Sequence, residues 1–127
     1  MACDVKPKFI LKLLIVSFLL LNTVLSGQNI IIKIHNKTGY KIDSLIVSTQ
    51  FIGTLENDSI SEAIHYEKFN FDSGMPYEGI FGIIGEKRLK NAWWSWCGTE
   101  RSTEYRGEYT FELSIQRYED KECLQLH

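Results

Sequence analysis

Proline is rare in this chain, with two residues among 127, and neither sign of charge dominates, with 14 Lys and Arg against 16 Asp and Glu. The scarcity of proline and an apolar fraction of 44% argue against a disordered or collagen-like chain. The near balance of charge provides no basic field for nucleic acid or for an acidic membrane surface. The length and composition therefore predict a single globular domain.

Motifs that assemble common catalytic and cofactor sites are also missing. The sequence has no CxxC pair, no Cys/His cluster with zinc-ligand spacing, no glycine-rich phosphate loop, and neither a GxSxG nor an HExxH motif. We therefore expect no metal and no cofactor, and the sequence favours a protein that is not an enzyme.

Residues 1–27 differ in kind from the rest of the chain. Lysines at positions 6, 8 and 12 precede an apolar run at 13–21, and small residues end the segment at Ser26 and Gly27. This order is typical of a secretory signal. We expect cleavage to leave 28–127 as the mature domain, secreted or periplasmic.

A retained membrane anchor is the alternative for the same segment. The apolar stretch from 9 to 25 is 17 residues long and is interrupted by Lys12 and Asn22, whereas a spanning helix needs about 20 residues. A membrane is therefore a partner only if residues 1–27 are retained. Cleavage removes three of the 14 basic and one of the 16 acidic residues, which leaves a net charge of −4.

A period of two predicts a strand from Tyr105 to Arg117 with one buried and one solvated face. The inward positions run from Tyr105 through Gly107, Tyr109, Phe111 and Leu113 to Ile115. A turn at 119–121 then allows an antiparallel hairpin in which Ile115 faces Leu124 and Leu113 faces Leu126. The same register places Cys123 opposite Gln116 on the polar face.

Several other short segments have the composition of strands. Turn-forming clusters separate them at 37–39, 57–58, 72–76, 85–86 and 97–99, and Gly39 and Gly53 suit a turn and a bulge. The pattern predicts an all-β domain, an antiparallel β-sandwich of immunoglobulin-like size, with a small barrel as the alternative. The expected strands, besides the hairpin, are 30–34, 42–49 with Leu45 and Val47 inward, 51–55 and 77–84.

The segment 57–71 is ambiguous. Ser59 to Glu62 fits a helix capping box, but Ile64, Tyr66 and the Phe69/Phe71 pair alternate as in strands. We favour strand over helix because the surrounding pattern is β.

Two cysteines remain in the mature domain, Cys97 and Cys123. An exported protein meets an oxidising compartment, where an even pair can form a disulfide. A disulfide with a solvent-facing Cys123 requires Cys97 to lie on the outside as well. The sequence alone therefore leaves both alternatives, a Cys97–Cys123 disulfide and two free thiols.

Trp93-Trp94-Ser95-Trp96 is the most unusual stretch. If it is extended, Trp94 and Trp96 share one face and Trp93 lies on the other. Trp94 and Trp96 suit a core, whereas Trp93 is the better candidate for contact with a sugar ring or a protein partner. The candidate binding surface is thus Trp93, Trp94 and Trp96.

Other polar residues have simpler interpretations. His65 and Glu67 share a strand face, yet without further ligands they are expected to be solvated. Glu108 and Glu112 lie on a polar strand face, and the segment 72–76 suits an ordinary turn better than a calcium site. Asn36 and Asn57 each begin an N-glycosylation pattern.

Three segments, 36–45, 71–74 and 96–109, resemble a pattern in small exported bacterial proteins of unknown function. The motifs are Asn-Lys-Thr-Gly-Tyr with Asp-Ser-Leu, then Phe-Asp-Ser-Gly, then Trp-Cys-Gly-Thr-Glu leading to Gly-Glu-Tyr. The resemblance implies export and an all-β fold, and it implies no activity.

Together these patterns favour an exported, non-enzymatic binding or structural module of the cell envelope. Its expected partner is an envelope protein or a glycan, with no nucleic acid. The alternatives are a small secreted hydrolase that uses Asp or Glu residues and a membrane-anchored envelope protein.

Overall fold

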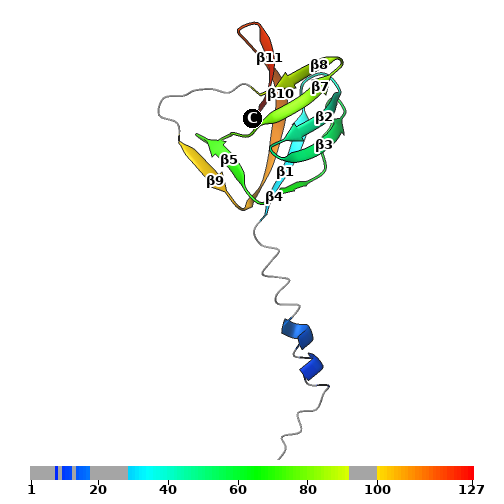
Figure 1. Cartoon of the computed structure of the whole chain (residues 1–127), viewed down its shortest axis with the longest axis vertical. Helices are drawn as coiled ribbons and strands as arrows, with labels where there is room; N and C mark the ends of the chain where they lie inside the picture. The colour runs from blue at the N-terminus through cyan, green and yellow to red at the C-terminus, as the bar shows by residue number, and fades with distance from the viewer. Residues whose placement is uncertain (1–7, 9, 13, 18–28, 92–99) are drawn as a thin grey trace, which may run out of the picture.

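The computed structural model describes residues 8, 10–12, 14–17, 29–91 and 100–127. The early residues of this set are helical and exposed, and strands follow from Ile30 (Figure 1). Within these ranges no helix has the length and apolar content needed to cross a membrane. The strands are β1 Ile30–Asn36, β2 Ile42–Val47, β3 Gln50–Leu55, β4 Ile64–Tyr66, β5 Phe69–Asp72, β6 Met75–Pro76, β7 Ile80–Ile84, β8 Lys87–Lys90, β9 Arg101–Glu104, β10 Gly107–Tyr118 and β11 Lys121–Leu126.

The strands form three sheets. Two have four strands, in the orders β11-β10-β1-β4 and β3-β2-β7-β8, and the third has the order β6-β5-β9. The all-β prediction is confirmed, and the ladders are antiparallel except for β1 and β10, which run parallel. An isolated parallel bridge between Asn91 and Leu124 links the end of β8 to β11.

β1 is an interior strand of its sheet, between β10 and β4. Ile30, Ile32 and Ile34 have no exposed surface, and the residues between them are half-buried. The predicted strand at 30–34 is confirmed and continues to Asn36. β-Branched side chains at alternate positions fill one face of the pleat, which favours this extended conformation.

The β10–β11 hairpin has the register that the sequence predicts. Leu113 pairs with Leu126, Ile115 with Leu124, and Gln116 with Cys123. The expected turn contains Glu119 and Asp120, both at positive φ. Two such residues suit the tight connection of an antiparallel hairpin, because that backbone matches the twist of the strands.

The predicted inward positions of Tyr105 and Gly107 are wrong, because both residues are exposed. Tyr105 is 58% exposed and lies in the bend between β9 and β10. β10 begins at Gly107, whose φ of 133° is one that other residues rarely adopt. This glycine interrupts the alternation, and the ring of Tyr109 covers the space where a side chain at 107 would lie.

β2 and β3 form a bulged hairpin. The register shifts on both sides of the pair between Leu45 and Gly53, and Gly53 has φ of 91°. The predicted bulge at Gly53 is therefore confirmed. Leu45 and Val47 are fully buried, as their inward positions predict.

The segment 57–71 contains strands and no helix, as favoured. β4 and the first part of β5 bury Tyr66, Phe69 and Phe71. The capping-box alternative is wrong: the hydroxyl of Ser59, the expected N-cap residue, donates a hydrogen bond back to the carbonyl of Glu56 at 2.7 Å. The hydroxyl oxygen of Ser61 accepts a hydrogen bond from the backbone N–H of Ile34 at 2.9 Å. The bond from Ile34 holds this segment against β1 beyond the end of its pairing with β4.

The predicted strand at 77–84 is confirmed as β7, although it begins at Ile80 and not at Tyr77. It lies between β2 and β8. Ile80 faces the core, whereas Phe81 and Ile83 are half-buried on the opposite face. The segment is hydrophobic at both alternating sets of positions because apolar side chains point inward from one set and outward from the other.

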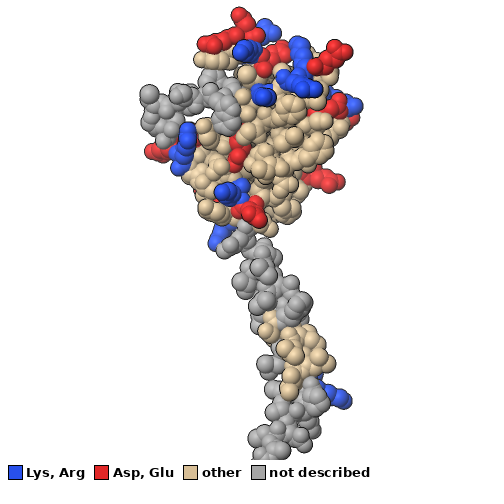
Figure 2. Space-filling view, in the orientation of Figure 1, with Lys and Arg blue, Asp and Glu red and all other residues tan. Residues whose placement is uncertain are grey.

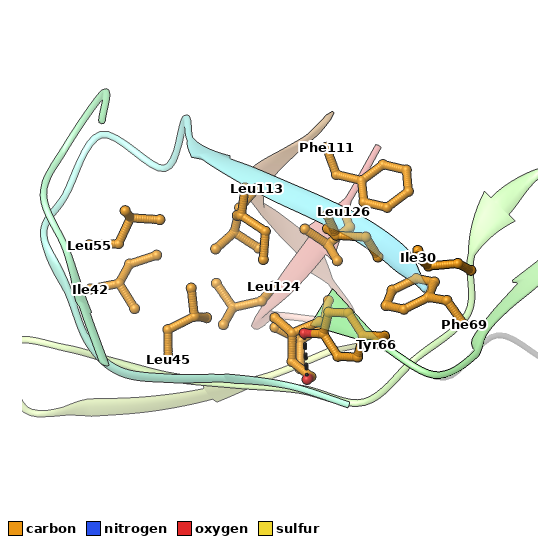
Figure 3. Close-up of a cluster of buried hydrophobic side chains, with 14 of the residues drawn as sticks. Ile30, Ile42, Leu45, Leu55, Tyr66, Phe69, Phe111, Leu113, Leu124 and Leu126 are labelled. Carbon is orange, nitrogen blue, oxygen red and sulfur yellow. Dashed lines mark hydrogen bonds between the residues drawn. The ribbon is translucent and has the colours of Figure 1, made fainter. Parts of the chain in front are cut away.

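Both four-stranded sheets contribute to one hydrophobic core. Ile42 and Leu45 from β2 lie near Leu113 from β10 and Leu124 from β11 (Figure 3). The hydroxyl of Tyr66 on β4 donates a hydrogen bond to the carbonyl of Val47 on β2 at 3.0 Å, which ties the sheets together. Burial raises the pKa of this hydroxyl, so it stays protonated through the physiological range.

Candidate binding surfaces

Trp93, Trp94, Trp96 and Cys97 lie outside the described residues, so the binding surface and the disulfide stay predictions. Cys123 is half-buried on β11. In the sequence, the tryptophan segment lies between Asn91 and Arg101. Asn91 forms a β-bridge with Leu124, and Arg101 is the first residue of β9.

An Asp–Arg–Tyr cluster adjoins the end of that segment. The guanidinium of Arg101 lies 4.7 Å from the centre of the Tyr77 ring and donates a hydrogen bond to the Tyr77 hydroxyl at 3.1 Å. The Arg101 Nε lies 4.0 Å from Oδ2 of Asp72, whose side chain is 10% exposed. Among the described residues this Oδ2 has no hydrogen-bond partner. The cluster therefore combines an aromatic ring, a cation and a buried acceptor.

The turn at 72–76 has the ordinary form that the sequence favours. Ser73 and Gly74 adopt positive φ between β5 and β6. The Ser73 N–H donates to the carbonyl of Glu100 at 2.7 Å, which fixes the turn against the start of β9. The guanidinium of Arg101 beside Asp72 further disfavours a cation here.

A cleft of about 720 Å³ lies between the β7–β8 hairpin, the β10–β11 pair and the chain before β2. Its apolar floor comes from Ile84, Leu89 and Ile115, and Tyr40 lies at its rim. A concave, mainly apolar surface of this size is typical of ligand sites. The lining residues are Tyr40, Lys41, Asp43, Ile84, Gly85, Glu86, Lys87, Leu89, Ile115 and Glu122.

Ion pairs engage two of the carboxylates in this cleft. Glu122 lies 3.4 Å from the ammonium of Lys87 and 3.5 Å from the guanidinium of Arg117. Asp43 lies 3.8 Å from Lys41 and accepts a hydrogen bond from Thr54 at 3.2 Å. These ion pairs are exposed to solvent to different extents. The rim of the cleft therefore carries both positive and negative charges.

A second, more polar cleft of about 410 Å³ lies near the start of β1. His65 and Glu67 both line it, and both are exposed. The Glu78 carboxylate accepts hydrogen bonds from the backbone and the side chain of Asn70 at 2.9 and 3.0 Å. In the part of the chain that the structure describes, no group of three metal-binding side chains is found.

Asn36, which begins one glycosylation pattern, is a structural residue. It is fully buried. Its amide nitrogen contacts the carbonyls of Tyr40, Leu55 and Glu56 at 2.7, 3.0 and 3.1 Å. Its oxygen accepts bonds from the backbone and hydroxyl of Thr38 at 3.1 and 2.6 Å. An attached glycan would require this whole network to open, so Asn36 is not a suitable acceptor.

A surface ion-pair group lies next to Asn36. Asp58 Oδ1 is 2.7 Å from the ammonium of Lys37 and 3.0 Å from Nε2 of His35. The hydrogen bond from Lys37, followed by that from His35, holds the pKa of Asp58 below its ordinary value. The same bond raises the pKa of Lys37.

Sequence patterns identified the surface position of Glu108 and Glu112, which are exposed. They did not identify the two clefts, because these bring together residues from segments far apart in the chain. They also missed the role of Asn36. The available signal was that Asn36 continues the alternation of the inward-facing residues Ile30, Ile32 and Ile34, which places its side chain in the core.

Comparisons of the chain with protein-family models, with curated proteins and with solved structures gave no match.

Proposed function

We propose that this chain is an exported, non-enzymatic binding module of the cell envelope, built as a β-sandwich of immunoglobulin-like size. Its ligand is an envelope protein or a glycan, and its location is secreted or periplasmic after loss of residues 1–27. The basic, apolar and small-residue order of that segment supports export. The shared core of the two four-stranded sheets supports the sandwich.

The Asp72–Tyr77–Arg101 cluster is the observation that carries the binding proposal. Arg101 of this cluster lies five residues after Trp96 in the sequence, and Asp72 holds a buried carboxylate oxygen without a hydrogen-bond partner among the described residues. The exposed guanidinium of Arg101 can donate hydrogen bonds to ligand oxygens, and indole and phenol rings supply flat apolar area. We infer that Trp93 and this cluster contact the same ligand.

Capture from the native envelope with immobilised protein tests the proposal. We expect the wild type to retain a ligand that Trp93→Ala and Arg101→Ala lose, while circular dichroism of both variants stays unchanged. Tyr105→Ala is the matched control, because Tyr105 is an exposed aromatic outside the cluster. Sensitivity of the ligand to protease or to periodate distinguishes a protein from a glycan. Equal capture by wild type and Trp93→Ala would refute this site.

The N-terminus of the natural protein tests export separately. Cell fractionation and terminal sequencing should find a chain that begins at Gly27 or Gln28 outside the cytoplasm. An intact N-terminus in the membrane fraction would instead support the anchored alternative.

A further inference from the structure

The outer face of the β3-β2-β7-β8 sheet carries a continuous row of apolar side chains. Ile46 lies between the buried Leu45 and Val47, so it points away from the core. It pairs with Phe51 on β3 and with Phe81 on β7. Directly paired residues have side chains on the same face, about 5 Å apart. Phe51, Ile46 and Phe81 therefore form one row across three strands, called here the apolar row.

The apolar row is open to solvent. Phe51 is 69% exposed, the highest value among the large hydrophobic residues of the described chain, and Ile46 and Phe81 are partly exposed. Figure 2 shows a broad area without charged side chains over β2, β3 and β7. The solvated face of an antiparallel sheet usually carries polar residues. A contiguous apolar area at such a face is typical of an interaction surface.

Basic residues border this row along β8. Lys90 pairs with Phe81, and Arg88 pairs with Ile83, which points outward beside the row. Both basic side chains are exposed, and neither forms an ion pair with another described residue. One side of the apolar surface therefore has positive charge that is available to a partner.

We propose that this face binds a polypeptide segment that has apolar side chains on one face and carboxylates along one side. The apolar side chains would pack on Phe51, Ile46 and Phe81, and the carboxylates would pair with Arg88 and Lys90. A membrane fits this face less well, because Phe51 is the one residue of the row that is largely exposed, and the chain has a net charge of −2. This surface is additional to the one proposed around Trp93.

Two fluorescent peptides of equal length test the proposal. Both carry leucines along one helical face, and one carries glutamates beside them where the other carries lysines. Fluorescence anisotropy with the full chain should give an affinity for the glutamate peptide at least about tenfold higher. Phe51→Ser should lower this affinity about tenfold through loss of buried aromatic area. Charge reversal at both Arg88 and Lys90 should invert the preference.

Two control variants leave the face intact. Tyr105→Ser removes an exposed aromatic residue elsewhere, and Lys68→Glu reverses a charge on another part of the surface. Both should bind the glutamate peptide like the wild type. Because Phe51 and Lys90 are exposed, thermal unfolding of their variants should confirm that the fold is retained.

Three results would overturn the proposal. The first is equal binding of both peptides, or binding that ignores Phe51→Ser. The second is a dimer, detected by sedimentation equilibrium, that Phe51→Ser dissociates, since the face would then receive a second copy of this chain. The third is Phe51-dependent binding to phosphatidylglycerol vesicles without peptide binding, which would assign the face to a membrane.

Discussion

Asn36 holds a turn and two strand ends together through one side chain. Its amide contacts three carbonyls in a fully buried position. Replacement by Ala leaves these carbonyls without their donor, so we expect Asn36→Ala to lower the free energy of unfolding by about 2–4 kcal/mol. Urea denaturation measures the loss. The matched control is Asn57→Ala at the other glycosylation pattern, where the residue is exposed and the change should stay within about 0.5 kcal/mol.

The exposed Asp58 group predicts a small pH dependence. Asp58 has its pKa lowered from 3.8 by hydrogen bonds from Lys37 and His35. A carboxyl group whose pKa falls on folding stabilises the folded state above its unfolded pKa and loses that contribution as pH falls through the folded pKa. Asp58→Asn should therefore reduce the loss of stability below about pH 4, by a small amount because the pair is exposed. Unfolding measured at pH 7 and pH 3 tests this, and an identical pH profile in both proteins would contradict it.

At the scale of elements, Gly82 on β7 leaves room in the core for Ile42 of the neighbouring strand β2 and for Leu124 of the opposite sheet. A Cβ at this position would lie 2.8 Å from Ile42 Cγ2 and 3.3 Å from Leu124 Cδ1. Gly82→Ala should therefore destabilise the protein by about 1–3 kcal/mol through overpacking, seen as a lower Tm. Gly79→Ala is the control in the same region, since a Cβ there meets nothing within 4 Å. A larger Tm loss at Gly79 than at Gly82 would show that sheet packing is not the cause.

The same elements show what the sequence can predict. The pairing of Ile115 with Leu124 follows from local alternation across a short turn, because a one-residue slip would move every apolar side chain to the wrong face. The parallel pairing of β1 with β10 does not follow, because no short-range pattern specifies a partner so distant in the chain. The sequence shows that the residues around Phe81 are hydrophobic at both alternating sets of positions. The alignment of Phe81 with Phe51 is not visible there, because it depends on the bulged register of β2.

For the whole molecule, the described residues of the N-terminal segment contribute nothing to the hydrophobic core. All described residues between 8 and 17 are exposed, whereas Ile30 and Ile32 are fully buried. We expect deletion of residues 1–27 to leave the Tm of the β body within a few degrees, because the residues of this segment that the structure describes are exposed. Deletion of 1–32 removes two buried isoleucines and should prevent cooperative unfolding, since each costs about 2–5 kcal/mol when truncated. Thermal scans by circular dichroism compare the two, and similar Tm values would contradict the expectation.

The parallel ladder between β1 and β10 also sets the order of events during synthesis. The first strand cannot complete its hydrogen bonds until the ribosome has released nearly the entire polypeptide, because its neighbour is the penultimate strand. For a chain that leaves the cytoplasm as we propose, this sheet would stay incomplete until the end of synthesis, and its closure would then occur after passage through a translocation channel.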